Sequence, residues 1–229
     1  MVPLLVLFAR MDQRTASATS LAAIVPTAIV GSLTYLAHGQ VDFVAGGFIA
    51  IGAIAGALLG SLLLERLPLV WLRWAFIVFL LLIAIRMFLV SPVRGENLGI
   101  SPVLIGGYIA LGLVMGFASG LFGIGGGAIA VPALIGIFAL SDLIAKGTSL
   151  LVMIPTSVVG TVANWRAKTV DVVAGLVVGV LATVGSIPGT LLALALSPRL
   201  SAILFGALLL VIATDLAVRA VRQGRAGTA

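Results

Sequence analysis

Several kinds of side chain are scarce in this sequence, and each scarcity excludes a class of protein. The chain has no cysteine and one histidine, so disulfides, thiolate metal sites and a histidine-rich catalytic or metal cluster are excluded. Charged residues make up 9% of the 229 residues, whereas hydrophobic residues make up 62%. Because a soluble domain needs a charged surface, we expect this chain to be dissolved in lipid.

The charge is basic but dispersed. Lys and Arg number 13 against 7 Asp and Glu, which gives a net charge of +6. The basic residues stand singly between apolar runs, with no stripe and no nucleic-acid-binding motif, so we expect no nucleic-acid partner. They are typical of the flanks of membrane spans. The first nine residues lack a basic leader and a cleavage site, so insertion is expected to rely on the spans themselves.

Long apolar runs divide the chain into membrane spans. A span needs about 20 apolar residues, and seven segments satisfy this requirement: 16–37, 41–64, 69–90, 103–122, 146–165, 170–196 and 200–218. The apolar piece 128–140 is too short to cross, so it is expected to be a half-helix. The predicted fold class is an all-α polytopic integral membrane protein with about seven transmembrane helices plus short half-helices.

The chain contains an internal repeat with an offset of 129 residues. Residues 2–84 align without a gap to residues 131–213. The matching anchors are Val2-Pro3 with Val131-Pro132, Thr19-Ser20-Leu21 with Thr148-Ser149-Leu150, Pro26 with Pro155, Gly31 with Gly160, Val41-Asp42 with Val170-Asp171, and Gly60 with Gly189. We therefore expect a first repeat at 1–90, a connecting loop at 91–101, a second repeat at 102–219 and a basic tail at 220–229.

The first repeat is incomplete, because the counterparts of residues 102–130 would precede Met1. Either the polypeptide begins about 30 residues upstream or one span has been lost, and we favour the first. Sidedness indicates that the two repeats are inverted. If 103–140 returns to its starting side, Lys and Arg divide nine to four between the two faces, as the positive-inside rule prefers. The richer face then carries Arg10, Arg14, Arg66, Arg73, Arg166, Lys168, Arg219, Arg222 and Arg225.

The stretch most indicative of function is GFASGLFGIGGGAIAVP at 116–132. Gly123, Gly125, Gly126 and Gly127 can adopt positive φ and bring backbone N–H groups toward a ligand. The half-helix that follows directs its partially positive N-terminus to the same place. These glycines, with the neighbouring Ser119, are therefore candidate binding residues for a small anion.

The glycine run is also compatible in part with other kinds of motif. The glycines could instead serve close helix packing, as small-xxx-small motifs do in lipid. A dinucleotide site lacks the strand and βαβ unit that it requires, and no P-loop sequence is present. An intramembrane serine protease built on Ser119 lacks a base, since His38, the only histidine, is expected in a solvated loop. We therefore predict neither an enzyme nor a metal site nor a cofactor.

Two Thr-Ser pairs, Thr19/Ser20 and Thr148/Ser149, occupy equivalent positions in the two repeats. Their hydroxyls are candidates to coordinate an oxyanion, although capping or bonding to the preceding turn explains them equally well. Pro26 and Pro155, seven residues after each threonine, are expected to kink their helices, as is Pro132 after the glycine run.

Three carboxylates lie at or near the spans. Asp42 and Asp171 begin helices and are expected to act as N-caps in preference to a proton-coupling role. Asp215 lies inside the last apolar run, and Arg219, four residues on, is its expected partner.

The glycine signature from Gly116 to Pro132, the repeated Thr-Ser-Leu with its following proline and the Val-Asp that opens the next helix resemble the TauE/SafE sulfite exporter family. The resemblance covers essentially the whole chain. It implies a permease of a bacterial-type inner (plasma) membrane that exports sulfite, sulfoacetate or a related organosulfur anion, with sites at Gly123–Gly127, Thr19, Ser20, Thr148 and Ser149. The alternative is a non-transporting membrane scaffold or subunit, and homo-oligomerisation stays open.

Overall fold

The computed structural model describes residues 11–64 and 101–226, together with Val2, Leu5 and single positions between 68 and 85. Every element in these residues is a helix: α2 (Gln13–Ala37), α3 (Phe43–Leu64), α5 (Pro102–Phe122), α6 (Gly127–Gly136), α7 (Asp142–Arg166), α8 (Val172–Ala195) and α9 (Pro198–Ala226). Most of the predicted span 69–90 and of the connecting loop 91–101 lies outside the described residues.

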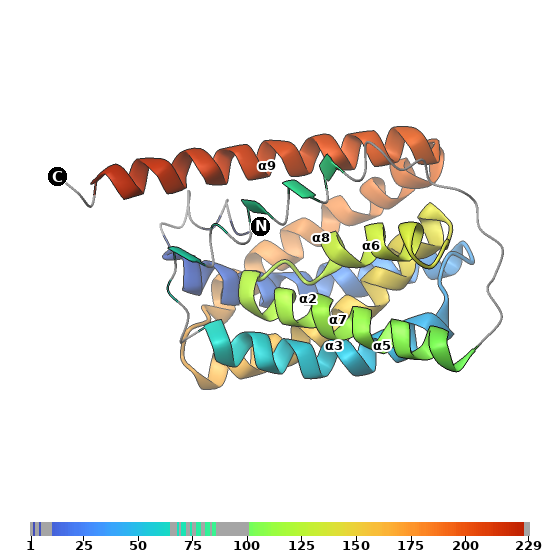
Figure 1. Cartoon of the computed structure of the whole chain (residues 1–229), viewed down its shortest axis with the longest axis horizontal. Coiled ribbons are helices and arrows are strands. Elements are labelled where there is room, and N and C mark those ends of the chain that lie inside the picture. Colours follow the sequence, from blue (N-terminus) through green and yellow to red (C-terminus); the bar gives the residue numbers. More distant parts are fainter. Residues whose placement is uncertain are drawn as a thin grey trace.

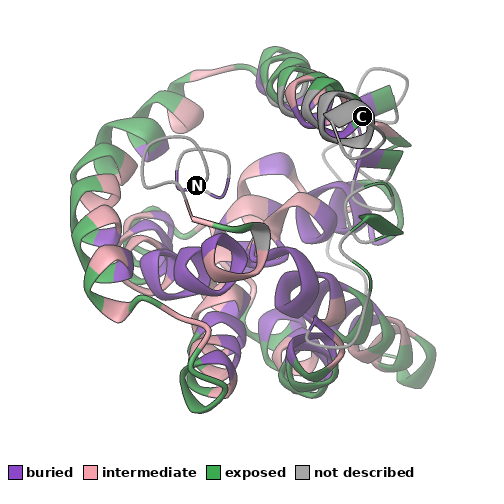
Figure 2. Cartoon of the chain, turned by 90° about the vertical axis from the view of Figure 1, so that its left-hand side faces the viewer, coloured by how far each residue is buried: buried purple, intermediate pink, exposed green. Residues whose placement is uncertain are grey.

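Apart from α6, each of these helices is long and apolar enough to cross a membrane. Buried residues gather at the centre of the bundle and exposed residues surround it (Figure 2). The outward residues are large and apolar along every span, with Leu33 at 57%, Ile51 at 60% and Leu181 at 68% exposure. Lipid is the solvent that such a surface requires, so the predicted all-α polytopic membrane fold is confirmed.

Most helix boundaries lie within three residues of the sequence prediction, and the larger differences are in α7, α6 and α9. The first turn of α7 was missed, since α7 begins at Asp142, where the Ser141 side chain accepts a hydrogen bond from the Ile144 N–H at 3.3 Å. The half-helix α6 ends at Gly136 because the chain turns at Ala139, whose φ is 53°. The last helix, α9, extends past the apolar run to Ala226, since Arg, Gln and Ala favour the helix without being apolar.

Helices α3 and α5 lie side by side in unusually close contact. Glycines of α3 (Gly52, Gly56 and Gly60) face the α5 backbone, and glycines of α5 (Gly112, Gly116 and Gly120) face the α3 backbone. A Cβ at Gly56 would lie 2.7 Å from the Phe117 amide nitrogen. Small residues at every fourth position therefore allow these two backbones to touch, as is common between helices in lipid.

The two halves of the chain pack crosswise. Helix α2 lies against α8, where Gly175 meets Ala22, and α3 lies against α7, where Gly46 meets Leu151. Equivalent helices run in opposite directions, as the colour gradients of α2 and α7 show in Figure 1. This is the arrangement of an inverted repeat, although the exact repeat boundaries stay a prediction.

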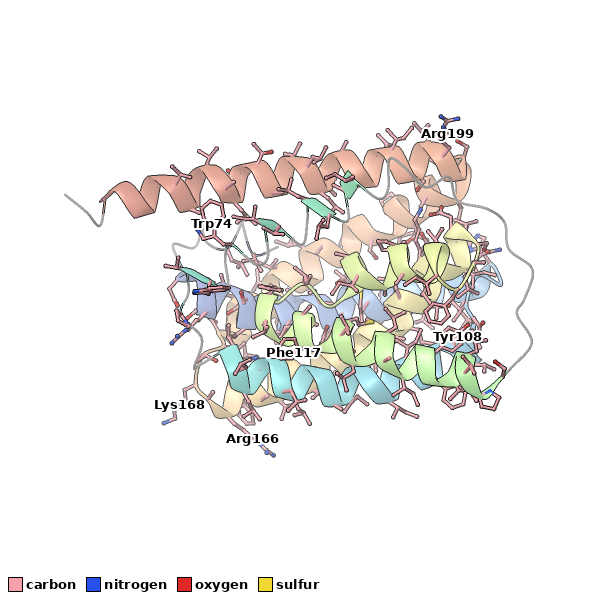
Figure 3. The ribbon with its side chains drawn as sticks, in the orientation of Figure 1. Trp74, Tyr108, Phe117, Arg166, Lys168 and Arg199 are labelled. Atoms are coloured by element: carbon pink, nitrogen blue, oxygen red, sulfur yellow. The ribbon has the colours of Figure 1, made fainter. Side chains whose placement is uncertain are left out.

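The chain reverses between α5 and α6, so that α6 runs back along α5 (Figure 1). The rings of Tyr108, near the start of α5, and Phe138, just after α6, stack with centroids 4.6 Å apart. The segment therefore returns to the side from which it started. Arg166 and Lys168 lie at the end of the molecule opposite Arg199 (Figure 3), in agreement with the expected sidedness.

Candidate functional site

The reversal between α5 and α6 is made by the glycine run. Gly123, Gly125 and Gly126 have φ values of 66°, 69° and 82°, a region that other L-residues adopt only at a cost. The Gly123 N–H donates to the Ser119 carbonyl at 2.8 Å and ends α5. The loop is also tightly enclosed, because a Cβ at Gly126 would lie 2.8 Å from the Met115 methyl. Both the conformation and the space require glycine here.

Helix α6 begins at Gly127 without a side-chain cap. The first amides of a helix have no acceptor within it and carry its partial positive charge. Gly123 and Gly127, on either side of this terminus, line a cavity of about 680 Å³. The uncapped helix end therefore adjoins an open volume.

This cavity lies among five helices and the glycine loop. Its wall is mostly apolar, and the polar side chains among the residues that line it are Thr27, Tyr35, Lys146, Ser149, Ser186, Thr190 and Ser201. Thr190, at 6% exposure, is nearly buried. Within the described part of the chain, Lys146 is the charged residue of the lining. In an apolar cavity, water and salt screen little of the attraction between such a cation and a nearby anion.

Lys146 projects from the second turn of α7. Its ammonium group donates to Asp142 Oδ2 at 2.8 Å and to Ser201 Oγ on α9. The side chains of Lys146 and Asp142 are 18% and 3% exposed. The sequence did not predict this ion pair, because the predicted span began at residue 146 and left Asp142 outside it. The signal that could have found it is the Ser141-Asp142 start of the helix with a lysine four residues later.

The two threonines of the Thr-Ser pairs join the two halves of the chain. The Asp42 N–H donates to Thr148 Oγ1 at 2.9 Å, and the Asp171 N–H donates to Thr19 Oγ1 at 3.1 Å. Each bond is the counterpart of the other at the offset of 129 residues. Both threonines are fully buried and lie outside the cavity lining.

The two serines of these pairs have different surroundings. Ser20 donates to the carbonyl of Gly123 and so fastens the glycine loop to α2. Ser149 lines the cavity, and its hydroxyl donates to the Lys146 carbonyl at 2.8 Å. Ser119 is fully buried, and its hydroxyl has no hydrogen-bond partner in the described part of the chain.

Of the candidate binding residues, the structure thus brings Gly123, Gly127 and Ser149 together around the cavity. The remaining candidates are buried and do not line the cavity: Gly125, Gly126, Ser119, Thr19, Ser20 and Thr148. Pro26, Pro132 and Pro155 lie inside α2, α6 and α7, and their expected kinks stay a prediction. Whether any of these residues binds a ligand also stays a prediction.

The carboxylates at the helix starts are N-caps, as expected. Asp42 Oδ1 accepts from the Ala45 N–H at 3.0 Å, and Asp171 Oδ1 accepts from the Ala174 N–H at 2.9 Å. His38 is exposed just after α2, as its predicted loop position requires. The predicted partner of Asp215, the Arg219 side chain, lies outside the described residues.

Comparison with known proteins gives one family and two relatives. The family model described as "Sulfite exporter TauE/SafE" matches residues 1–141 and 108–228. The chain is 27% identical to "Probable membrane transporter protein YunE" of Bacillus subtilis (strain 168), over 69% of this chain and 64% of the relative. It is 29% identical to "Probable membrane transporter protein YdhB" of the same organism, over 75% of this chain and 71% of the relative. The chain therefore spans just under two thirds of the first relative's length. No solved structure matches the chain.

Proposed function

Since the chain belongs to the sulfite exporter TauE/SafE family, we propose that it is a secondary transporter that exports sulfite, sulfoacetate or a related organosulfur anion across a bacterial-type inner membrane. The observation that carries this proposal is the cavity in which Lys146 and the start of α6 meet. Both of the named relatives carry the words "membrane transporter protein" in their names.

The cavity suits a small oxyanion on chemical grounds. Sulfite and sulfonate groups present several negatively charged oxygens that accept hydrogen bonds. The Lys146 ammonium, the Thr190 hydroxyl and the uncapped amides of α6 are donors at or beside the cavity. The Ser149 hydroxyl lines the cavity as well and becomes a donor to the anion when it turns away from the Lys146 carbonyl. Charge-assisted hydrogen bonds of this kind are stronger in an apolar setting. We propose that these groups bind the anion, with water filling the rest of the volume.

Movement of the anion is proposed to follow from the inverted arrangement of the two halves. In transporters built from inverted repeats, one half rocks against the other around a central site. Here the cavity is lined by α2 from the first half and by α6, α7, α8 and α9 from the second. The reciprocal Thr19 and Thr148 contacts hold the two halves together at opposite ends of α2 and α7.

The proposal is tested by the flux of radiolabelled sulfite into liposomes that carry the chain, with protein-free liposomes as the blank. We expect saturable flux that sulfate or a short organosulfonate reduces by competition. The variant Asp142→Asn with Lys146→Met removes both charges together, so no unpaired charge is left buried. It is expected to slow flux at least about ten-fold because the charge-assisted bonds to the anion are lost.

The matched control is Arg199→Met, which removes an exposed cation outside the cavity lining. Its flux is expected to equal that of the unaltered chain. Absence of saturable flux in the unaltered chain would contradict the proposal. Stoichiometric co-purification with another protein would then favour the scaffold alternative.

A further inference from the structure

The Asp142–Lys146 ion pair has a feature that substrate binding alone does not explain. Asp142 Oδ2 accepts from Lys146 at 2.8 Å, but the other carboxylate oxygen, Oδ1, is buried and has no hydrogen-bond partner in the described part of the chain. A buried carboxylate is costly unless it is paired and hydrogen-bonded. Besides the partial positive charge at the start of α7, Lys146 is therefore the full charge that offsets Asp142 among the described residues.

That cation is also exposed to the cavity. Lys146 lines the cavity wall, and its ammonium has three donors, of which Asp142 and Ser201 occupy two. Among the described residues that line the cavity, this ammonium is the charged group that a small anion would contact. The third donor is available to the anion, so the anion and the Asp142 carboxylate then share this one positive charge.

Few other groups near Asp142 can take part in this competition. Tyr35 on α2 lies close enough to interact electrostatically with Asp142. Asp42, at the start of α3, is engaged with the amides of its own helix, and Arg199 at the start of α9 is exposed. The described residues of α6 and α8 carry no titratable side chain. Charge balance at the site is therefore set mainly by Asp142, Lys146 and the anion.

We propose that Asp142 couples anion transport to protons, because the transported anion displaces its carboxylate from Lys146 and the displaced carboxylate takes up a proton. This inference rests on the proposed function. The proton comes from the water on the side where the anion enters, and an O–H bond forms on Asp142. When the anion leaves on the other side, the proton is released there and the ion pair forms again.

Charge neutrality makes the coupling strict. The empty site holds one cation and one carboxylate, and the loaded site holds one cation, a singly charged anion and a neutral carboxylic acid. Both states are neutral and can be enclosed in an apolar environment. The site with an anion and an ionised Asp142 carries a net negative charge, which is costly to enclose. One singly charged anion therefore moves with one proton and transfers no net charge, so export in this mode follows the concentration gradient of the anion and is opposed by a more acidic exterior.

The experiment uses liposomes carrying the whole chain and measures two quantities for sulfite. The first is accumulation driven by an imposed pH gradient, with the membrane potential clamped at zero. The second is exchange of labelled for unlabelled sulfite without any gradient. The unaltered chain is expected to do both. Asp142→Asn is expected to lose gradient-driven accumulation but to keep exchange, with an apparent affinity roughly ten-fold tighter because no carboxylate competes for Lys146.

The control is Asp171→Asn, because asparagine caps a helix about as well as aspartate and residue 171 lies outside the cavity lining. It is expected to keep both activities. Gradient-driven accumulation in Asp142→Asn would overturn the coupling role, as would loss of exchange together with accumulation, which a merely structural residue would produce. Should that variant fail to insert, the unaltered chain still decides, since exchange without any response to the pH gradient overturns the proposal. Absence of exchange in the unaltered chain would instead contradict the proposed function.

Discussion

Helices α3 and α8 occupy equivalent positions in the two halves of the chain, yet their surroundings differ. In α3, Gly56 and Gly60 touch the backbone of α5, whereas their counterparts Gly185 and Gly189 in α8 have nothing within 4 Å of a Cβ. Of the most apolar stretch of each helix, 44% is buried in α3 and 11% in α8. A small-residue pattern therefore permits close packing but does not produce it, since the partner decides what the glycines do.

The largest difference in stability is expected between two alanine variants, one at Gly56 in α3 and one at its counterpart Gly185 in α8. Gly56→Ala puts a Cβ 2.7 Å from the Phe117 nitrogen, so it forces α3 and α5 apart and is expected to cost about 4 kcal/mol or more. Gly185→Ala meets open space and is expected to be neutral or to stabilise by up to about 1 kcal/mol. Thermal unfolding in detergent, followed by size-exclusion chromatography, measures both. Equal stabilities would refute the proposed difference between the helices.

A second difference between the halves is the ion pair itself, because the counterparts of Asp142 and Lys146 are Gln13 and Ser17. Lys146→Met leaves a buried carboxylate unpaired, which is expected to destabilise the fold by roughly 3 kcal/mol at neutral pH. Adding Asp142→Asn is expected to restore most of that stability. Unfolding of the two single variants and the double variant gives the interaction energy of the pair. Additive effects would show that the two charges do not depend on each other.

The two halves are alike in the hydrogen bonds that Thr19 and Thr148 accept from the opposite half. Thr19→Val and Thr148→Val each remove the acceptor of one aspartate N–H and keep the volume of the side chain nearly unchanged. Each is expected to cost about 1–2 kcal/mol, because a half-buried amide is left without its partner. The control is Thr34→Val, whose hydroxyl bonds only within its own helix. A large difference between the two threonine variants would contradict their equivalence.

The smallest effect is expected where the two halves share a backbone conformation but not a residue type. Gly39 and Lys168, 129 residues apart, follow equivalent helices with φ values of 68° and 58°. Gly39→Ala is expected to destabilise by about 1 kcal/mol, and Lys168→Gly to stabilise by about as much, because glycine adopts this conformation without strain. The same unfolding measurements test both. A destabilised Lys168→Gly would indicate that the lysine side chain contributes more than its backbone costs.

Hydropathy and the repeated anchors predicted most of the fold. The six spans among the described residues, the half-helix after the glycine run and the opposite directions of the two halves all follow from apolar length, helix-breaking glycines and basic flanks. The first turn of α7 escaped prediction because Asp142 and Lys146 interrupt the apolar run. Their mutual neutralisation, which makes burial possible, depends on side-chain geometry that a hydropathy average does not contain.

The candidate site was predicted less completely. The glycine run could be recognised because positive φ and a broken helix leave a composition signal. Thr19 and Thr148 could not be assigned, because a hydroxyl that binds an anion and one that accepts an amide from the other half have the same sequence. Ser149 and Ser20 also differ in their surroundings despite identical motifs. Ser149 lines the cavity, whereas Ser20 contacts the glycine loop and does not line it.

The crosswise packing of α2 on α8 and of α3 on α7 means that neither half is self-sufficient at its contacts. Each half supplies helices against which those of the other half pack, and each accepts, through Thr19 or Thr148, an amide hydrogen bond from the opposite half. A chain of half the length would therefore need a second copy, inserted in the opposite orientation, to supply these amides. The full chain holds both orientations in one polypeptide, and its second half carries the charge pair Asp142–Lys146 where the first half has Gln13 and Ser17.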